Sequence, residues 1–328
     1  MKKIIGMCLG IVMIFNCTFI KVDGHENNKY SEEINIANEF IRNVLNKDSY
    51  NRIIELYDTN DNIKYLFFDL KQDGYVIIDI ENNIVVEGGT EENKYIPQVD
   101  EKCYYNGPLL YYEKSNNHFI EVHSRQVVDK RDLAESKEIS RKAVNRSKVI
   151  REKQSNIMPL ANTEYAITIT GTLPNYSYNP NGICGSTAAA MFLRYLDIYV
   201  NSNYVATSLQ TSDGEALIRE LVSYIDGWFP GSNANDMKSG LQKYINSRGI
   251  SHTVVKENYS SSSFKTRINA NRPVLIDLDN HPTYNEHWVT AYGYYISTTP
   301  TVAYVIVNDG WGNRGVYINP SYIGYIVY

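Results

Sequence analysis

The sequence predicts an α+β protein of two units, and three features of the chain support this. A helical pattern and strand-like runs occupy residues 25–125, a densely charged segment follows at 126–160, and over 161–328 helical patterns come first and strand-like runs come last. Helices segregated from an antiparallel sheet are typical of α+β folds. The length of 328 residues also exceeds the usual size of one domain, which is about 100–200 residues.

The first residues have the features of an export signal. Lys2 and Lys3 precede a mostly apolar run at 4–20, and the sequence VDG at 22–24 suits cleavage. We therefore expect a signal peptide at 1–24 and a secreted, extracellular bacterial protein with no stable membrane insertion once the signal is removed. An uncleaved membrane anchor is the alternative. No later run reaches the roughly 18 apolar residues that span a bilayer.

Residues 25–125 predict one helix packed on an antiparallel sheet. Apolar residues recur at spacings of three and four over 31–47, as on one face of an amphipathic helix. These residues are Ile34, Ala37, Ile41 and Val44. Strand-like runs follow at 52–57, 63–70, 75–80 and 84–87. The turn signals DG at 73–74 and NN at 82–83 separate the later runs.

Residues 126–160 differ from both flanking units. Basic residues outnumber acidic ones roughly twofold here, and the apolar residues are too scattered to form a core face. We expect a charged linker that is accessible to proteases, particularly those that cut after Lys or Arg.

Residues 161–328 predict helices followed by a sheet. We expect a strand at 165–170, helices at 185–199, 214–225 and 235–247, and then the strands of an antiparallel sheet. Those strands are expected near residue 254 and at 274–278, 289–295, 302–307, 315–318 and 322–327.

Cys184 lies where the turn-prone segment YNPNGI, 178–183, meets the predicted helix. The free N–H groups at a helix N-terminus stabilise a thiolate, so this position predicts a reactive cysteine. Cys8 and Cys17 lie in the predicted signal, which leaves Cys103 and Cys184 in the exported chain. The alternatives are a buried structural cysteine or a disulfide between these two residues.

A thiolate nucleophile needs a base and a group that orients the base. His287 begins the predicted strand HWVTAYGY and is the candidate base, with the loop residue His281 as the alternative. The next predicted strand leads into NDGWG at 308–312. If the two strands pair in antiparallel fashion, Asn308 or Asp309 approaches His287, and Trp311 shields their hydrogen bond from water.

Together these motifs resemble those of the papain-like (clan CA) cysteine peptidases. The sequence CGS at a helix start resembles the nucleophile, HWVTAYGY resembles the H-x-V-x-A-x-G-Y strand, and DGWG resembles N-S-W-G with Asp309 in place of Asn. The Cys-His-Asp set is similar to that of bacterial bacteriocin-processing-like peptidases, and residues 25–125 resemble the pro-domain of streptopain-like peptidases. The resemblance implies a papain-like catalytic domain at 161–328, with a helical part before an antiparallel sheet.

The resemblance implies a secreted cysteine peptidase made as a zymogen. Cys184 is then the nucleophile, His287 the base and Asp309 its orienting partner. The implied partners are a peptide or protein substrate and the intramolecular pro-domain.

The oxyanion donors are less well defined. Papain-like enzymes place a Gln six residues before the Cys, where this chain has Tyr178. The Cys184 N–H can be one donor, and Tyr178, Asn179 and Asn181 are candidates for the second. Asn181 also suits a simple turn.

Two other functions fit the same fold: an amidase or cell-wall endopeptidase, and a weak or inactive papain-like domain that acts as a secreted binding or surface protein. The net charge of −5 gives no indication of nucleic-acid binding. The chain has no HExxH, paired CxxC or P-loop motif, so we expect no metal and no cofactor. The weaker alternative is a chelate of His281 and His287 with Asp277, Asp279 or Glu286.

Overall fold

The computed structural model describes residues 29–91, 102–116, 118–129, 165–226, 232–278, 287–296 and 302–328. The predicted signal peptide and most of the charged segment lie outside the described residues, as do His281, Asp279 and Glu286. We call the described residues 29–129 the N-terminal half and the described residues 165–328 the C-terminal half. Within the described residues, no helix has the length and apolar character needed to cross a bilayer.

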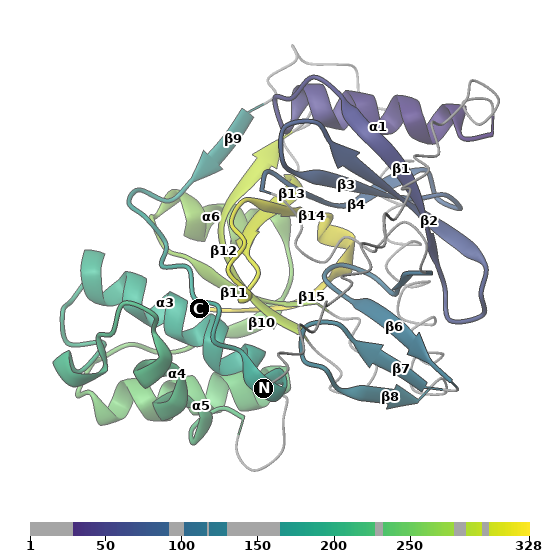
Figure 1. The fold of residues 1–328 in the computed structure, drawn as a ribbon. Coiled ribbons are helices and arrows are strands. Elements are labelled where there is room, and N and C mark those ends of the chain that lie inside the picture. The colour runs from purple at the N-terminus through teal and green to yellow at the C-terminus, as the bar shows by residue number, and fades with distance from the viewer. Residues whose placement is uncertain are drawn as a thin grey trace, which may run out of the picture.

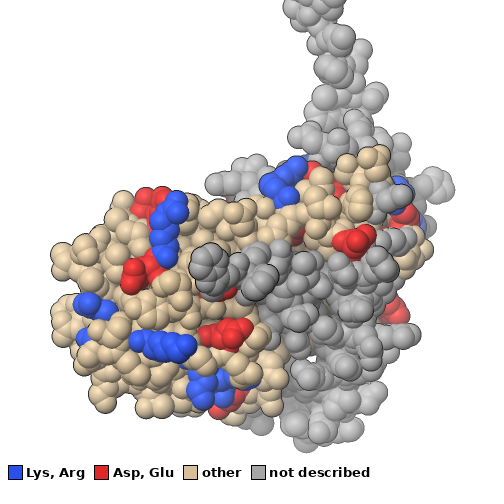
Figure 2. Space-filling model, turned by 90° about the horizontal axis from the view of Figure 1, so that it is seen from below, with Lys and Arg blue, Asp and Glu red and all other residues tan. Residues whose placement is uncertain are grey.

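The described residues form one 15-stranded, largely antiparallel sheet with five α-helices, an arrangement compatible with an α+β fold (Figure 1). The strand order is β10-β15-β11-β12-β13-β14-β4-β3-β2-β1-β5-β6-β7-β8, with β9 paired to β12. On the face drawn in Figure 2, acidic and basic side chains are interspersed and form no patch of one sign.

The expected helix and four strands are present in the N-terminal half. They are α1 (Ser31–Asn43), β1 (Tyr50–Tyr57), β2 (Ile63–Leu70), β3 (Tyr75–Asp79) and β4 (Ile84–Gly89). The apolar face of α1 packs on this sheet through Ala37, Phe40 and Ile41, as the spacing predicts. Gly88 allows the close approach of the helix, because a Cβ there would lie 2.6 Å from Cε1 of Phe40.

Four short strands extend the N-terminal half beyond the prediction. They are β5 (Tyr104–Tyr105), β6 (Tyr111–Ser115), β7 (His118–Glu121) and β8 (Val127–Asp129). They are two to five residues long, too short for a clear alternation in the sequence. Strand β8 reaches Asp129 and so extends into the segment expected to be a linker.

In the C-terminal half α3, α4 and α5 lie together at one side of the sheet, and α6 lies apart from them against β9, β11 and β12 (Figure 1). The elements are β9 (Tyr165–Thr168), α3 (Cys184–Tyr199), α4 (Glu215–Val222), α5 (Ala234–Ser247), β10 (Lys256–Asn258), α6 (Ser261–Asn269), β11 (Val274–Leu278), β12 (His287–Ile296), β13 (Val302–Asn308), β14 (Val316–Ile318) and β15 (Ile323–Val327). Helix α3 is buried along nearly its whole length in the largest core cluster, where it contacts β12. Helix α6 was not expected from the sequence.

The two halves share the sheet through β4 and β14. Val316, Tyr317 and Ile318 pair with Gly89, Gly88 and Glu87 in antiparallel register. One hydrophobic cluster crosses this junction, where the rings of Phe40 and Tyr304 meet edge to face at 4.8 Å. The two expected units are therefore joined by backbone pairing and by a common core.

Candidate active site

Cys184 is the first residue of α3 and follows a 3-10 turn at Pro180–Gly182. The turn reverses the chain through two residues with positive φ, Asn181 (57°) and Gly182 (79°). Thr187, one helical turn after the cysteine, donates from Oγ1 to the carbonyl oxygens of Tyr178 (2.9 Å) and Ile183 (3.1 Å). These bonds fix the loop before Cys184 on the first turn of the helix.

The Cys184 sulfur lies at the start of β12. The backbone N–H groups of Trp288 and Gly185 adjoin this sulfur and lower the pKa of the thiol. Trp288 directly follows His287, so the candidate nucleophile and base belong to one site. Thr290, further along β12, donates from Oγ1 to the Ala188 carbonyl (2.9 Å) and holds α3 against the strand.

The predicted lowering of the Cys184 pKa is wrong for this structure. The side chain is only 6 % exposed, and burial raises its pKa to about 12. The Asp226 and Asp277 carboxylates raise the pKa further, while the N–H groups of Trp288 and Gly185 lower it. Desolvation disfavours the charged form more than the helix N-terminus favours it. Cys184 is therefore a neutral thiol here.

Asp226 was not identified from the sequence, although it supports the start of α3. Its carboxylate accepts hydrogen bonds from the backbone N–H (3.2 Å) and the hydroxyl of Ser186. A Cβ on Gly185 would lie 3.0 Å from Oδ1 of Asp226 and 2.2 Å from Oγ of Ser232. A glycine is therefore needed directly after the cysteine. No local sequence pattern links Asp226 to a helix that begins 42 residues earlier.

His287 is the first residue of β12, paired with Leu278 of β11, and is 2 % exposed. Its ring stacks on the Trp311 indole, with 4.3 Å between centroids and 5° between planes. The structure thus brings His287 and Trp311 together, and the shielding role of the indole remains a prediction.

Asp309 is fully buried after the end of β13. Its Oδ1 accepts from the N–H groups of Trp311 (2.8 Å) and Asn313 (3.0 Å), and its Oδ2 accepts from Nδ2 of Asn313 (2.6 Å). These bonds hold the carboxylate within its own loop, and burial raises its pKa to about 6. Asn308 instead donates from Nδ2 to the Pro174 carbonyl (3.0 Å), which ties β13 to the segment before Cys184. The orienting role of Asp309 remains a prediction.

The three candidate oxyanion donors lie in different environments. The Arg219 guanidinium of α4 lies over the Tyr178 ring, with 4.7 Å between its central carbon and the ring centroid. Asn181 is exposed, as a turn residue would be. Asn179 is 7 % exposed, and neither atom of its amide group has a hydrogen-bond partner within the described part of the chain. A Cβ on Gly310 would lie 3.8 Å from Nδ2 of Asn179, so this amide group adjoins the loop that follows Asp309.

A second histidine at the site comes from the N-terminal half. His123, in the turn between β7 and β8, stacks on the Trp311 indole with 4.0 Å between centroids and 17° between planes. Gln126, three residues later, donates from Nε2 to the Asn181 carbonyl (3.0 Å). The sequence offered no signal for this role, because His123 lies far from the three motifs in the chain.

The predicted disulfide alternative is wrong, because Cys103 and Cys184 are both free. They also lie in different hydrophobic clusters, one in each half. Within the described residues no group of three or more His, Cys, Asp or Glu side chains is placed to hold a metal ion. The alternative chelate cannot be assembled from these residues, since three of its proposed members lie outside them.

Comparison with known proteins agrees with this geometry. Residues 170–322 match the model of the Peptidase_C39 like family, a region that contains Cys184, His287 and Asp309. No curated protein matches the chain significantly. The family match supports a cysteine peptidase of the papain-like and C39 type.

Proposed function

We propose that this protein is a secreted cysteine peptidase made as a zymogen, with Cys184 as nucleophile, His287 as general base and acid, and Asp309 as the residue that favours the orientation of the imidazole. The observation that carries the proposal is the packing of the start of β12 on the start of α3: Nε1 of Trp288 donates to the Ser232 carbonyl (2.7 Å), and Ser232 lies against Gly185, the residue after Cys184. It joins the start of α3 to the residue next to His287, which are the two positions that the chemistry requires.

The reaction follows from these groups. His287 takes the proton from the Cys184 thiol, and the sulfur attacks the peptide carbonyl carbon to form a C–S bond and an oxyanion. The imidazolium returns the proton to the amine nitrogen as the C–N bond breaks, which leaves a thioester. His287 then takes a proton from water, whose oxygen attacks the thioester. Release of the acid and reprotonation of Cys184 complete the cycle.

We assign the oxyanion to the Cys184 backbone N–H and the Asn179 side chain. Asn179 is favoured over Tyr178 and Asn181, because its buried Nδ2 has no hydrogen-bond partner within the described residues. A buried amide without a partner has lost its hydrogen bonds to water, and a substrate oxygen can supply one of them. Removal of one such donor typically lowers kcat by about 10²–10³-fold.

The zymogen proposal rests on the burial of Cys184 and on the charged segment between the two halves. The Cys184 side chain is almost fully buried and its pKa is raised, so the sulfur is neither accessible nor ionised in this form. The charged segment between the halves offers many Lys and Arg residues for cleavage. We place activation within this segment and secretion with the N-terminal signal peptide.

The test is covalent labelling with a thiol-reactive epoxide peptidase inhibitor, read by mass spectrometry on the full chain before and after limited cleavage between residues 130 and 164. We expect Cys184 labelling that increases after cleavage and collapses in His287→Ala. Cys103→Ala is the matched control and should label like the wild type. A Cys184→Ala protein that still hydrolyses peptides would refute the assignment.

A weak or inactive binding protein is the second candidate. It is favoured by Tyr178 in place of the usual Gln and by the Asp309 carboxylate, whose hydrogen bonds stay within its own loop. Absence of Cys184 labelling in both the intact and the cleaved chain would select this function. Free amines released from purified cell-wall material, with little hydrolysis of ordinary peptides, would instead select an amidase or cell-wall endopeptidase.

A further inference from the structure

We propose that residues 118–129, the hairpin of β7 and β8, act as a latch on the active site, and that this latch opens while the rest of the N-terminal half stays bound through the shared sheet. The inference rests on the proposed peptidase function. It specifies how the site is regulated: activation opens a hairpin and does not require dissociation of the N-terminal half.

The latch contacts both sides of the site. His123 stacks on Trp311, and the same indole stacks on the candidate base His287. Gln126 donates to the Asn181 carbonyl, three residues before Cys184. One hairpin turn therefore contacts the loop that leads into the nucleophile and the aromatic ring that packs on the base.

The second attachment of the N-terminal half is different in kind. Strands β4 and β14 pair over three residues, and Asn319 adds two hydrogen bonds, from its N–H to the Val86 carbonyl (3.1 Å) and from Nδ2 to the Val85 carbonyl (3.0 Å). Tyr295 donates from its hydroxyl to the Asn43 carbonyl (3.0 Å). This junction consists of regular backbone pairing reinforced by side chains.

The same junction is apolar on the face covered by α1. Phe40 contacts the rings of Tyr304 and Tyr317 from the C-terminal half, at 4.8 and 6.1 Å between centroids, and Ile306 is buried in the same cluster. Dissociation of the N-terminal half would expose these side chains and leave β14 as an open edge strand. Both consequences favour a complex that persists after the connecting chain is cut.

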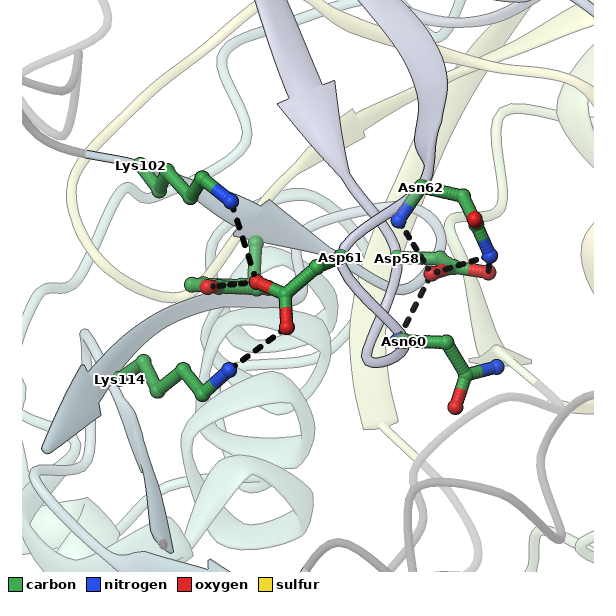
Figure 3. Close-up of polar contacts among 7 residues, drawn as sticks. Asp58, Asn60, Asp61, Asn62, Lys102 and Lys114 are labelled. Atoms are coloured by element: carbon green, nitrogen blue, oxygen red, sulfur yellow. Dashed lines mark hydrogen bonds and ion pairs between the residues drawn. The ribbon is translucent and has the colours of Figure 1, made fainter. Parts of the chain in front are cut away.

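The base of the latch is fixed to the N-terminal half. Buried Glu87 accepts hydrogen bonds from the hydroxyls of Tyr105 (2.9 Å) and Tyr111 (3.0 Å), which hold β5 and β6. Asp61 at the β1–β2 turn pairs with Lys102 (3.3 Å) and Lys114 (2.8 Å), as Figure 3 shows. The hairpin of β7 and β8 lies beyond these anchors, at the end of the sheet.

The latch itself is held less firmly. Strand β8 is the last strand in the order of the sheet and pairs with β7, and Val127 on β8 is 64 % exposed. A short, partly exposed hairpin at the end of a sheet opens more readily than strands inside it. Movement of residues 118–129 can therefore release Trp311 and the loop before Cys184 without disturbing the β4–β14 junction.

The decisive experiment measures Cys184 alkylation by iodoacetamide in the full chain. The test variant is His123→Ala combined with Gln126→Ala, and the control is His118→Ala, a histidine on the same hairpin at the opposite end. We expect the Cys184 alkylation rate to rise about tenfold or more in the double variant, because a stacking contact and a hydrogen bond are lost. The control should match the wild type. Equal rates in all three proteins would overturn the latch.

A second measurement follows both halves after cleavage between residues 130 and 164. We expect the fragments to elute together on size exclusion, in the wild type and in the double variant. Separation of the fragments, with Cys184 reactive only afterwards, would show that the whole N-terminal half must leave. Hydrogen exchange of the wild type serves as an independent test: amides of β8 should exchange well before those of β4, and simultaneous exchange would contradict the proposal.

These results also separate the latch from the peptidase proposal. Iodoacetamide needs an accessible thiol but no catalytic base. Faster alkylation in the double variant, with epoxide labelling that does not depend on His287, would support the latch and reject the peptidase function.

Discussion

Acidification should open the latch, because His123 is buried there without its proton. Burial lowers the His123 pKa from an ordinary value of 6.5 to about 3. A released hairpin binds a proton at the ordinary pKa, so protons favour the open state. The closed state keeps its full stability above pH 6.5 and loses it progressively as the pH falls toward 3. Each pH unit below 6.5 shifts the equilibrium between the closed and open states by about 1.4 kcal/mol toward the open state. The total shift is about 100-fold by pH 4.5.

Other titratable groups near His123 must be separated from this effect. Glu121 accepts a hydrogen bond from the His123 N–H (3.0 Å), Tyr111 packs edge-on at 5.9 Å, and Tyr111 in turn donates to Glu87. Arg125 lies two residues away, and His287 shares the Trp311 indole. All these groups remain in His123→Gln, so the difference between this variant and the wild type isolates the His123 proton.

The assay is the alkylation rate of Cys184 between about pH 7.5 and 4.5, expressed as the ratio of wild type to His123→Gln. The supply of thiolate depends on pH in both proteins and cancels in the ratio. We expect the ratio to rise about 100-fold as the pH falls, in line with the pKa shift. His118→Gln should behave like the wild type. A ratio that stays flat with pH would refute the reasoning.

Three further predictions follow from the packing and the hydrogen bonds. Gly185→Ala should destabilise the protein by about 1–3 kcal/mol, seen as a lower Tm, because its Cβ would lie 2.2 Å from Oγ of Ser232; an unchanged Tm would contradict this packing. Glu87→Ala should cost about 3 kcal/mol or more in denaturant unfolding, since three tyrosine hydroxyls and one N–H lose their shared acceptor, and Glu87→Gln should cost less. The reverse order would contradict the role of Glu87 as a shared hydrogen-bond acceptor. Asn179→Ala should lower kcat about 100-fold with little change in KM, and a change confined to KM would remove Asn179 from the oxyanion site.

The sequence predicted elements well where the periodicity was long. The helix at 31–47 and the strands near 63–70 and 274–278 correspond to α1, β2 and β11. Helix α6 was missed because the run of four serines at 260–263, which forms its cap and first three residues, is typical of a loop. The residues that make it a helix are the cap Ser260, which accepts from the Ser263 N–H (3.2 Å), and the buried pair Phe264 and Ile268 one turn apart.

The pairing of β4 with β14 could not be predicted by local reasoning. Gly88 and Gly89 at the end of β4 resemble a turn that closes a domain, yet they pair with Tyr317 and Val316. The two glycines occupy a strand because Phe40 and Tyr75 pack directly against them, and larger residues would clash with these rings. The long-range packing determined this structure, and the local pattern contained no sign of it.

The candidate site was predicted where a motif carried it. Cys184, His287 and Trp311 belong to motifs, and the structure brings them to one place. His123 and Asp226 have equally direct contacts with the site, but no motif surrounds them. A histidine on a short hairpin and an aspartate after a helix have many ordinary roles. Only the fold reveals what they contact.

The pKa of Cys184 shows why a local rule can have the opposite result in a folded chain. The position of this residue at the start of α3 favours a thiolate, and the N–H groups of Gly185 and Trp288 do lower its pKa. Stabilisation by a helix terminus is usually about 0.3–1 kcal/mol at a surface, whereas full burial can shift a pKa by about 3–5 units. Burial therefore prevails while the site is covered. Water that enters when the latch opens removes most of that penalty and leaves the N–H groups in place. We therefore expect the same donors, which now only partly offset burial, to become the dominant influence in the open state and to favour the thiolate that the proposed mechanism requires.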